Sequence, residues 1–294
     1  MELIQQLING LMLGSMYALI AIGYTLVFGI LNLLNLAHGE VFMFSGFFAA
    51  YAMNSFGLPL YLALPMSIML AAILGILIER ICFRPVKPQY HLAPLVSTIA
   101  AGTVLTSLAV KLGGSEPQVF QSTLSLPEWK LGGILISSTQ LLILGIALVL
   151  MVGITLLLQR TRTGRAMRTL SENPVAAKLF GVNVNRIIVA TFAISSLLAG
   201  VAGLLIGLRF EKISPFIGAT MGLKGLAVMV IGGLGNVYGA MVGGLLIGLL
   251  EVLVVALPYG TAPFMDAVVW GFLVLVLLVK PSGLFGSRIQ VERV

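Results

Sequence analysis

The long apolar runs of this chain constrain its fold more than any other feature. Residues 141–158 form one such run and include no charged side chain. A helix crosses the hydrocarbon core of a bilayer with about 20 mostly apolar residues, whereas a strand of a membrane β-barrel alternates apolar and polar residues over roughly 10 positions. The run is apolar on every side, so it predicts a membrane-spanning helix.

The composition extends this prediction to the rest of the chain. Of the 294 residues, 59% are hydrophobic and 9% are charged, and the mean hydropathy is +1.09. A soluble domain carries about 25% charged residues. The 34 glycines agree, because membrane helices use glycine more than soluble helices do. We therefore expect an all-α polytopic membrane protein in which residues 1–294 form a single transmembrane domain.

The positions of the apolar runs predict about eight or nine membrane segments. The second run is short and follows a polar stretch, so we expect a broken or re-entrant segment there. The runs lie near residues 7–31, 41–56, 58–78, 94–112, 138–158, 187–208, 216–234, 237–257 and 263–279.

The basic residues predict the orientation of these segments, because cytoplasmic loops carry an excess of Lys and Arg. The segment 159–186 contains Arg160, Arg162, Arg165, Arg168, Lys178 and Arg186. Two further basic groups fall on the same side when the segments alternate, namely Arg80, Arg84 and Lys87 in the first loop and Lys280, Arg288 and Arg293 in the tail. This side is expected to be cytoplasmic. The N-terminus lies outside if the second segment crosses the membrane and inside if it re-enters.

Several classes of function are disfavoured. The net charge is +7, but the charges lie between apolar runs rather than along one basic face, which argues against a nucleic-acid partner. Cys82 is the single cysteine and His38 is one of two histidines, so neither a disulfide nor a metal site is expected. The sequence contains no G-x-x-x-x-G-K-[ST] phosphate-binding loop, and no set of residues predicts a catalytic site.

The loop 160–186 contains signals for a short helix over residues 174–180. Asn173 followed by Pro174 is typical of a helix N-terminus, and Gly181 supplies a left-handed stop. A helix of about two turns is marginally stable alone in water, and this one would expose Leu179 and Phe180. Either it lies on the cytoplasmic ends of its own helices, or it docks into the groove of a partner.

Several motifs together resemble a known family. Ala176-Ala177-Lys178-Leu179-Phe180-Gly181 has the A-A-x-x-x-G spacing of the loop that couples ABC-importer permeases to their ATPases. The chain also contains, in order along the sequence, Asn35-Leu36-Ala37-His38-Gly39-Glu40, Gly164-Arg165-Ala166-Met167-Arg168, Gly232-Gly233-Leu234-Gly235-Asn236-Val237-Tyr238-Gly239-Ala240 and Pro281-Ser282-Gly283-Leu284-Phe285-Gly286. The set resembles the branched-chain and hydrophobic amino-acid permeases of ABC importers, specifically the shorter, H-type subunit.

This resemblance implies a type II importer fold in the bacterial inner membrane and transport by alternating access. It implies a homologous M-type permease as partner, two cytoplasmic ATPase subunits that use ATP, and a periplasmic substrate-binding protein. The chain itself would bind no cofactor and would carry branched-chain or other neutral, hydrophobic amino acids. The resemblance makes residues 160–186 the coupling loop, and its expected contact residues are Gly164, Arg165, Arg168, Pro174, Ala176, Ala177, Leu179 and Gly181.

Two alternatives stay open at this point. A related ABC permease would carry urea or short amides, because the sequence does not distinguish the cargo. An ion-coupled secondary carrier would use an intramembrane carboxylate, and Glu251 would then be its coupling group.

Polar residues within the apolar segments are the candidates for a substrate pathway, since a charge at the bilayer centre costs about 2.5–3.5 kcal/mol. Broken helices present backbone groups to substrates, and two interrupted regions fit this pattern. The candidates are Asn32, Asn35, His38, Glu40, Asn236 and Glu251. The first four would otherwise lie at the headgroups, the glycines around Asn236 would otherwise serve helix packing, and Glu251 would otherwise pair with Lys224.

Overall fold

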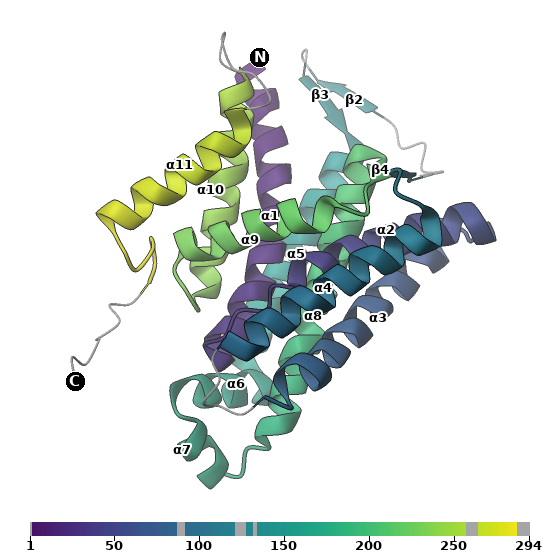
Figure 1. The fold of residues 1–294 in the computed structure, drawn as a ribbon. Coiled ribbons are helices and arrows are strands. Elements are labelled where there is room, and N and C mark those ends of the chain that lie inside the picture. The colour runs from purple at the N-terminus through teal and green to yellow at the C-terminus, as the bar shows by residue number, and fades with distance from the viewer. Residues whose placement is uncertain (1, 87–91, 121–127, 132–133, 257–263, 287–294) are drawn as a thin grey trace.

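The computed structural model describes residues 2–86, 92–120, 128–131, 134–256 and 264–286. Lys87, Arg288 and Arg293, which were used for the orientation, lie outside these residues. The described chain is mostly helical (Figure 1). Its helices are α1 (Glu2–Leu31), α2 (His38–Phe56), α3 (Leu60–Ile78) with the π-helical turn η1 (Glu79–Phe83), α4 (Leu92–Gly113), α5 (Ser138–Arg160), α6 (Arg162–Glu172), α7 (Pro174–Leu179), α8 (Val184–Phe210), α9 (Ile217–Gly232), α10 (Val237–Ala256) and α11 (Phe264–Val279).

Six helices in the described part of the chain are long and apolar enough to cross a membrane. They correspond to α1, α3 with η1, α4, α5, α8 and α10. Helices α9 and α11 are apolar but have 16 residues each. Helix α2 has 19 residues and carries His38 and Glu40 in its first turn. The structure therefore supports a multi-pass helical membrane protein, and the full count of eight or nine segments stays a prediction.

The two ends of the helical bundle differ in structure. The N-terminus and the β2–β3 hairpin lie at one end, and α6 and α7 lie at the other (Figure 1). We call the end with the N-terminus and the hairpin the β end. There the Leu135 amide of β3 donates a hydrogen bond to Gln5 Oε1 of α1 over 3.0 Å. At the far end of α2, Asn54 Nδ2 donates to the Val119 carbonyl over 3.0 Å. Helix α2 therefore ends beside Val119. Helix α1 begins at the β end, opposite the end that carries the basic loop.

The second segment is a continuous helix that begins inside the bundle. Helix α1 ends at Leu31, and Asn32 takes the left-handed conformation with φ 53°. The connection that follows returns to the interior, where the Leu36 amide donates to Thr98 Oγ1 over 3.2 Å. The ring of His38 then packs edge-on against Tyr24 of α1, with centroids 4.6 Å apart. The interruption expected from the sequence therefore lies in the connection between α1 and α2, and whether the segment re-enters stays a prediction.

Short strands are an addition to the all-α expectation. Strand β1 (Gln118–Val119) pairs antiparallel with β4 (Lys212–Ile213), and β2 (Glu128–Leu131) pairs antiparallel with β3 (Ile134–Ser137). Pairing satisfies backbone groups of segments that lie beyond the helix ends. Helix α6 was also not expected, because the sequence analysis placed only one short helix in the basic loop.

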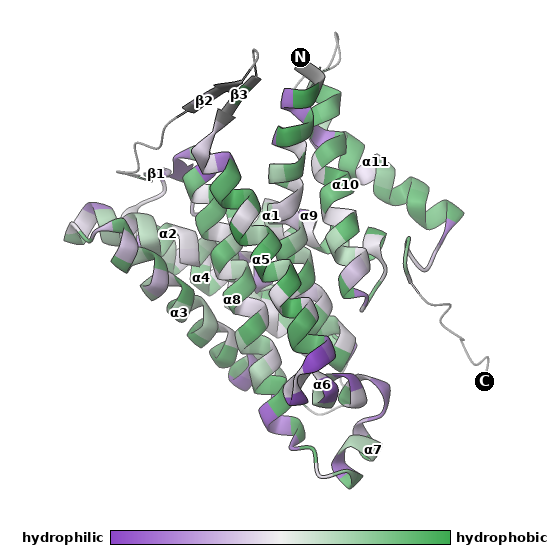
Figure 2. Ribbon diagram, turned by 180° about the vertical axis from the view of Figure 1, so that it is seen from behind, coloured by the Kyte–Doolittle hydropathy of each residue, from purple (hydrophilic) through white to green (hydrophobic). Residues whose placement is uncertain are grey.

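Apolar side chains cover the outer surface of the bundle as well as its interior. Figure 2 shows that α3, α4 and α5 consist largely of apolar residues, and many of their large apolar side chains are exposed. On α5, Leu148 is 63% exposed and Val149 is 70% exposed. Such a surface is stable in lipid and unfavourable in water, which agrees with a membrane environment.

Close packing between α1 and α10 forms the centre of the bundle. A Cβ added to Gly244 would lie 2.5 Å from the Cα of Ala18. One turn further along, Gly14 and Gly248 face each other, and a Cβ added to Gly248 would likewise overlap the backbone of Gly14. Small residues that let two backbones approach are the usual basis of helix association in membranes. The packing role expected for the glycines of this region is therefore confirmed.

We expect the Gly244→Leu substitution to destabilise the fold, because the added side chain would overlap the backbone of α1. Overpacking of a well-packed core costs about 1–3 kcal/mol. The midpoint of thermal unfolding in detergent should fall. Gly153→Leu is the matched control, because a Cβ at Gly153 on α5 meets nothing within 4 Å. Equal midpoints for the two variants would contradict the packing role.

Candidate functional site

Helix α6 presents a basic face at the end of the bundle opposite the β end. Thr161 caps the helix by accepting a hydrogen bond from the Gly164 amide over 3.0 Å. A Cβ at Gly164 would overlap the backbone of Leu158 on α5, so only glycine fits this contact. Met167 is buried beneath the helix, whereas Arg165 and Arg168 are exposed. The packing therefore holds both arginines at the outer surface.

Helix α7 forms as the local sequence predicts. Asn173 Oδ1 accepts from the amides of Val175 and Ala176 over 2.9 and 3.0 Å, and Pro174 occupies the first turn. Gly181 follows with φ 77°. The helix ends at Leu179, one residue before the expected end.

An apolar tip, which we define as Val175, Leu179 and Phe180, projects from α7. Their exposed fractions are 69%, 83% and 80%. Ala177 is fully buried and attaches the helix to the rest of the bundle. Of the two alternatives for this helix, lying flat on its own bundle would bury the tip. The exposure of all three side chains favours docking to a partner.

A cavity of about 510 Å³ lies beside α6 and brings together distant polar residues. It is lined by Asn32 at the end of α1, Asn236 before α10, and Arg168 of α6. Gln159 and Tyr238 also line it and are hydrogen-bonded to each other. Asn236 has a structural role as well, because its Oδ1 accepts from the Gly239 amide and its Nδ2 donates to the Phe285 carbonyl over 2.8 Å. The two polar interruptions predicted from the sequence, one at Asn32 and one at Asn236, therefore line the same cavity.

Asn35 and His38 lie in the interior near the start of α2. His38 is fully buried, and its Nδ1 lies 3.5 Å from Ser195 Oγ, which in turn donates to the Gly23 carbonyl over 2.8 Å. Asn35 is 2% exposed, and within the described residues its side-chain oxygen and nitrogen have no hydrogen-bond partner. Buried polar groups are normally paired. This region is therefore the least satisfied polar part of the described interior.

Glu40 faces a second cavity, of about 370 Å³, between the start of α2, α4 and α9. Its Oε2 accepts a hydrogen bond from Thr106 Oγ1 over 2.9 Å. Across the described ranges, no three His, Cys, Asp or Glu side chains form a group that could hold a metal ion.

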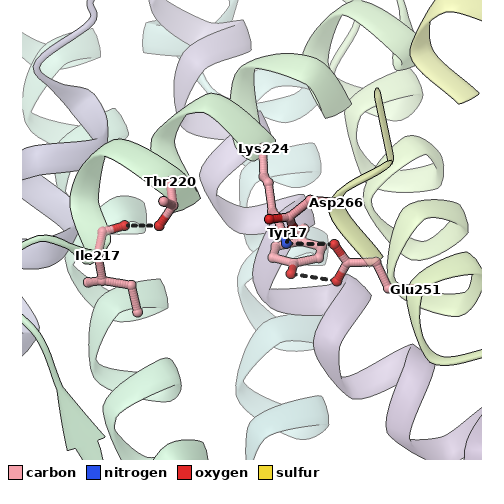
Figure 3. A network of polar contacts seen from close by, with 6 residues as sticks. All are labelled: Tyr17, Ile217, Thr220, Lys224, Glu251 and Asp266. Carbon is pink, nitrogen blue, oxygen red and sulfur yellow. Dashed lines mark hydrogen bonds and ion pairs between the residues drawn. The ribbon is translucent and has the colours of Figure 1, made fainter. Parts of the chain in front are cut away.

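Glu251 belongs to a polar network built from four helices (Figure 3), which is buried at Tyr17, Lys224 and Glu251 and exposed at Asp266. Lys224 Nζ of α9 lies 2.7 Å from Glu251 Oε1 and 2.7 Å from Asp266 Oδ1 of α11. Tyr17 of α1 donates to Glu251 Oε2 over 2.7 Å. The pairing of Glu251 with Lys224 expected from the sequence is confirmed, while a pathway role for Glu251 stays a prediction. Tyr17 was missed, because a tyrosine inside an apolar run gives no signal of its partner.

We expect Lys224→Met to lower the free energy of unfolding by about 3–5 kcal/mol, since it leaves the Glu251 carboxylate buried without a cation. The double variant Lys224→Met with Glu251→Gln should recover part of this loss. Thermal unfolding in detergent measures both effects, and Lys111→Met is the control at an exposed lysine. A Lys224→Met protein as stable as the parent would mean that the network does not hold the four helices together.

The fold and the polar interior define a multi-pass helical membrane protein of the permease type. Residues 6–278 match the family described as branched-chain amino acid transport system / permease component. The chain therefore belongs to this family, as its motifs predicted.

Two curated relatives extend the match over nearly the whole chain. The high-affinity branched-chain amino acid transport system permease protein BraD of Pseudomonas aeruginosa is 38% identical, covering 99% of this chain and 98% of BraD. The corresponding protein LivH of Escherichia coli K12 is 36% identical, covering 99% of this chain and 97% of LivH. The protein is a permease subunit of an ABC importer.

Two solved structures share the fold. The PsaBC complex of Streptococcus pneumoniae with a Fab matches with a TM-score of 0.52 at 10% identity, covering 93% of this chain and 91% of that chain. A metal-chelate type ABC transporter in an inward-facing conformation matches with a TM-score of 0.51 at 17% identity, covering 92% and 85%. These likenesses concern the fold alone.

Proposed function

We propose that this subunit carries branched-chain and other neutral, hydrophobic amino acids across the bacterial inner membrane by alternating access. The observation that carries this proposal is the full-length similarity to BraD and LivH, both of which are described as branched-chain amino acid permeases. A homologous M-type permease would complete the pathway, and a periplasmic binding protein would deliver the substrate. Family membership favours this ABC mechanism over an ion-coupled carrier.

The energy would come from two cytoplasmic ATPase subunits, and the chain would supply no ATPase site of its own. The apolar tip of α7 is the proposed contact with one of them. An exposed apolar cluster on a short helix gains stability when a groove covers it, and the tip lies at the end of the bundle expected to be cytoplasmic. Arg165 and Arg168 on α6 add positive charge beside it. Gly164, Pro174, Ala176, Ala177 and Gly181 would shape this element rather than make its main contacts.

Helix α6 would transmit movement of the ATPase into the bundle. Gly164 holds α6 against the end of α5 without an intervening side chain. Arg168 lines the same cavity as Asn32 and Asn236, which lie at the ends of α1 and α10. A displacement of α6 would therefore change the shape of this cavity. We place the inner part of the substrate pathway here and its intramembrane part along Asn35, His38 and Glu40.

The Leu179→Asp substitution is expected to weaken binding of the ATPase by about 30-fold, because removing a central apolar contact costs about 2 kcal/mol or more. Reversing the charges of Arg165 and Arg168 to Glu should also weaken it. Co-purification and titration with the purified ATPase measure the effect. The control is Val119→Asp, since Val119 is an apolar residue that is 59% exposed on β1, away from α6 and α7. Unchanged affinity of the Leu179→Asp complex would refute docking through α7.

Transport itself can be measured in proteoliposomes that contain the complete complex and its binding protein. We expect ATP-dependent uptake of radiolabelled leucine, isoleucine and valine, and no uptake by this chain alone under an ion gradient. Uptake by the isolated chain would overturn the ABC mechanism. Uptake of urea or acetamide in place of the amino acids would reassign the cargo.

A further inference from the structure

Glu40 is a carboxylate near the middle of the bundle. It contacts α4 at Gly102, close to the centre of that helix, where an added Cβ would lie 3.0 Å from Glu40 Cγ. On the other side its Oε2 lies against the Cα of Gly218 on α9, where any side chain would overlap it. Two glycines therefore leave room for this side chain. An ionisable residue at such a depth is costly and marks a functional site by default.

The charge of Glu40 has no counterpart among the residues that the structure describes. Both ion pairs in the described part of the chain belong to Lys224. Glu40 accepts one hydrogen bond from the neutral hydroxyl of Thr106. Glu251, another buried glutamate of the bundle, receives both a lysine and a tyrosine hydroxyl. The contrast indicates that Glu251 serves the structure, whereas Glu40 is available to an external cation.

The cavity in front of Glu40 fits a small amphiphilic molecule. Its volume of about 370 Å³ lies within the range of roughly 300–1,000 Å³ for ligand pockets. The hydroxyl-bearing residues Tyr24, Thr103 and Thr106 line it together with Glu40. The remaining lining is apolar or formed by glycine and includes Leu36, Ile99 and Leu223. The lining contains no Lys, Arg or His, so it offers a charged site for a cation and none for an anion.

A polar track on α4 leads to this cavity. Thr103, Ser107 and Lys111 are spaced by four residues, so they share one face of the helix, and all three are exposed. They line a second groove of about 600 Å³, which shares Thr103 with the cavity at Glu40. Ala100, Val104 and Leu108 line the same groove, so it joins polar and apolar side chains and suits a molecule that carries both.

We propose that Glu40 binds the ammonium group of the transported amino acid, with the apolar side chain of the substrate packed along Ile99 and Leu223. This inference rests on the proposed function, because it names the chemical group that the pathway recognises. The proposal also distinguishes the two kinds of cargo considered above, namely amino acids on one side and urea or short amides on the other. An amino acid brings the cation that Glu40 lacks, whereas urea and short amides are neutral.

The test uses a cysteine reporter in the complete transporter. Thr103→Cys places a thiol at the mouth of the cavity, and maleimide labelling of this chain is followed after the subunits are separated. The parent complex, in which Cys82 of this chain is buried, gives the background labelling. Leucine should slow the labelling, and so should leucinamide, which keeps the ammonium group but lacks the carboxylate. N-acetylleucine lacks the ammonium group and should give no protection.

Substitution of Glu40 gives the second arm. With Glu40→Gln, the leucine concentration needed for protection should rise about 10- to 100-fold, as expected for a lost charged hydrogen bond. Glu40→Asp should retain most of the protection. Glu116→Gln, at an exposed carboxylate before β1, is the matched control and should behave as the parent.

The outcomes separate this inference from the proposed function. Equal protection by leucine and N-acetylleucine, or unchanged protection in the Glu40→Gln complex, would overturn the role of Glu40 even where leucine uptake is intact. Absence of amino-acid uptake by the parent complex would instead overturn the cargo. If the Glu40→Gln complex fails to assemble, labelling of the Thr103→Cys complex in the presence of leucine, leucinamide and N-acetylleucine still tests the role of Glu40.

Discussion

The close approach of α1 and α10 is the contact on which the rest of the structure depends. Lipid tails are as apolar as leucine side chains, so no hydrophobic force drives membrane helices together, and packing must do so. Glycines on both helices allow their backbones to come within van der Waals distance. Helices α8 and α9 then pack around α1, and the outer helices α3, α4 and α5 keep apolar faces outward (Figure 2). The polar sites described above lie at the edges of this central pair.

The treatment of charge follows from the same environment. A carboxylate inside the bundle needs a partner, and two of the glutamates of the bundle, Glu251 and Glu40, meet this need differently. Glu251 is paired with Lys224 within the fold. Glu40 faces a cavity instead. Glu251 thus links the packing of α1, α9, α10 and α11, whereas Glu40 has no ion-pair partner among the described residues.

Local signals predicted much of this molecule from its sequence. Each expected membrane segment overlaps an observed helix, because the apolar runs match the thickness of a bilayer. Asn173, Pro174 and Gly181 act within a few residues of one another, so the start and stop of α7 could be predicted nearly to the residue. The pairing of Glu251 with Lys224 followed from the cost of an isolated charge.

Contacts between distant segments could not be predicted in the same way. The meeting of Asn32 with Asn236 depends on the antiparallel packing of α1 and α10, and the partnership of Tyr17 with Glu251 spans 234 positions. The return of the chain before α2 depends on Thr98 of a later helix. The β pairs gave signals too short to distinguish from loop, whereas the 11 residues of α6 were taken only as a basic loop. Which glutamate is satisfied and which is not could be learned only from the packed structure.

The exposed tip of α7 has a consequence for the assembly of the complex. Without the ATPase contact proposed above, most of the surface of Leu179 and Phe180 is accessible. Chaperones and proteases continuously select exposed apolar surface in the cell. A permease made in excess over its ATPase would carry such a surface for as long as it stays unpartnered. The same six-residue helix would then mark orphan subunits for removal and so keep the ratio of the two subunits in balance.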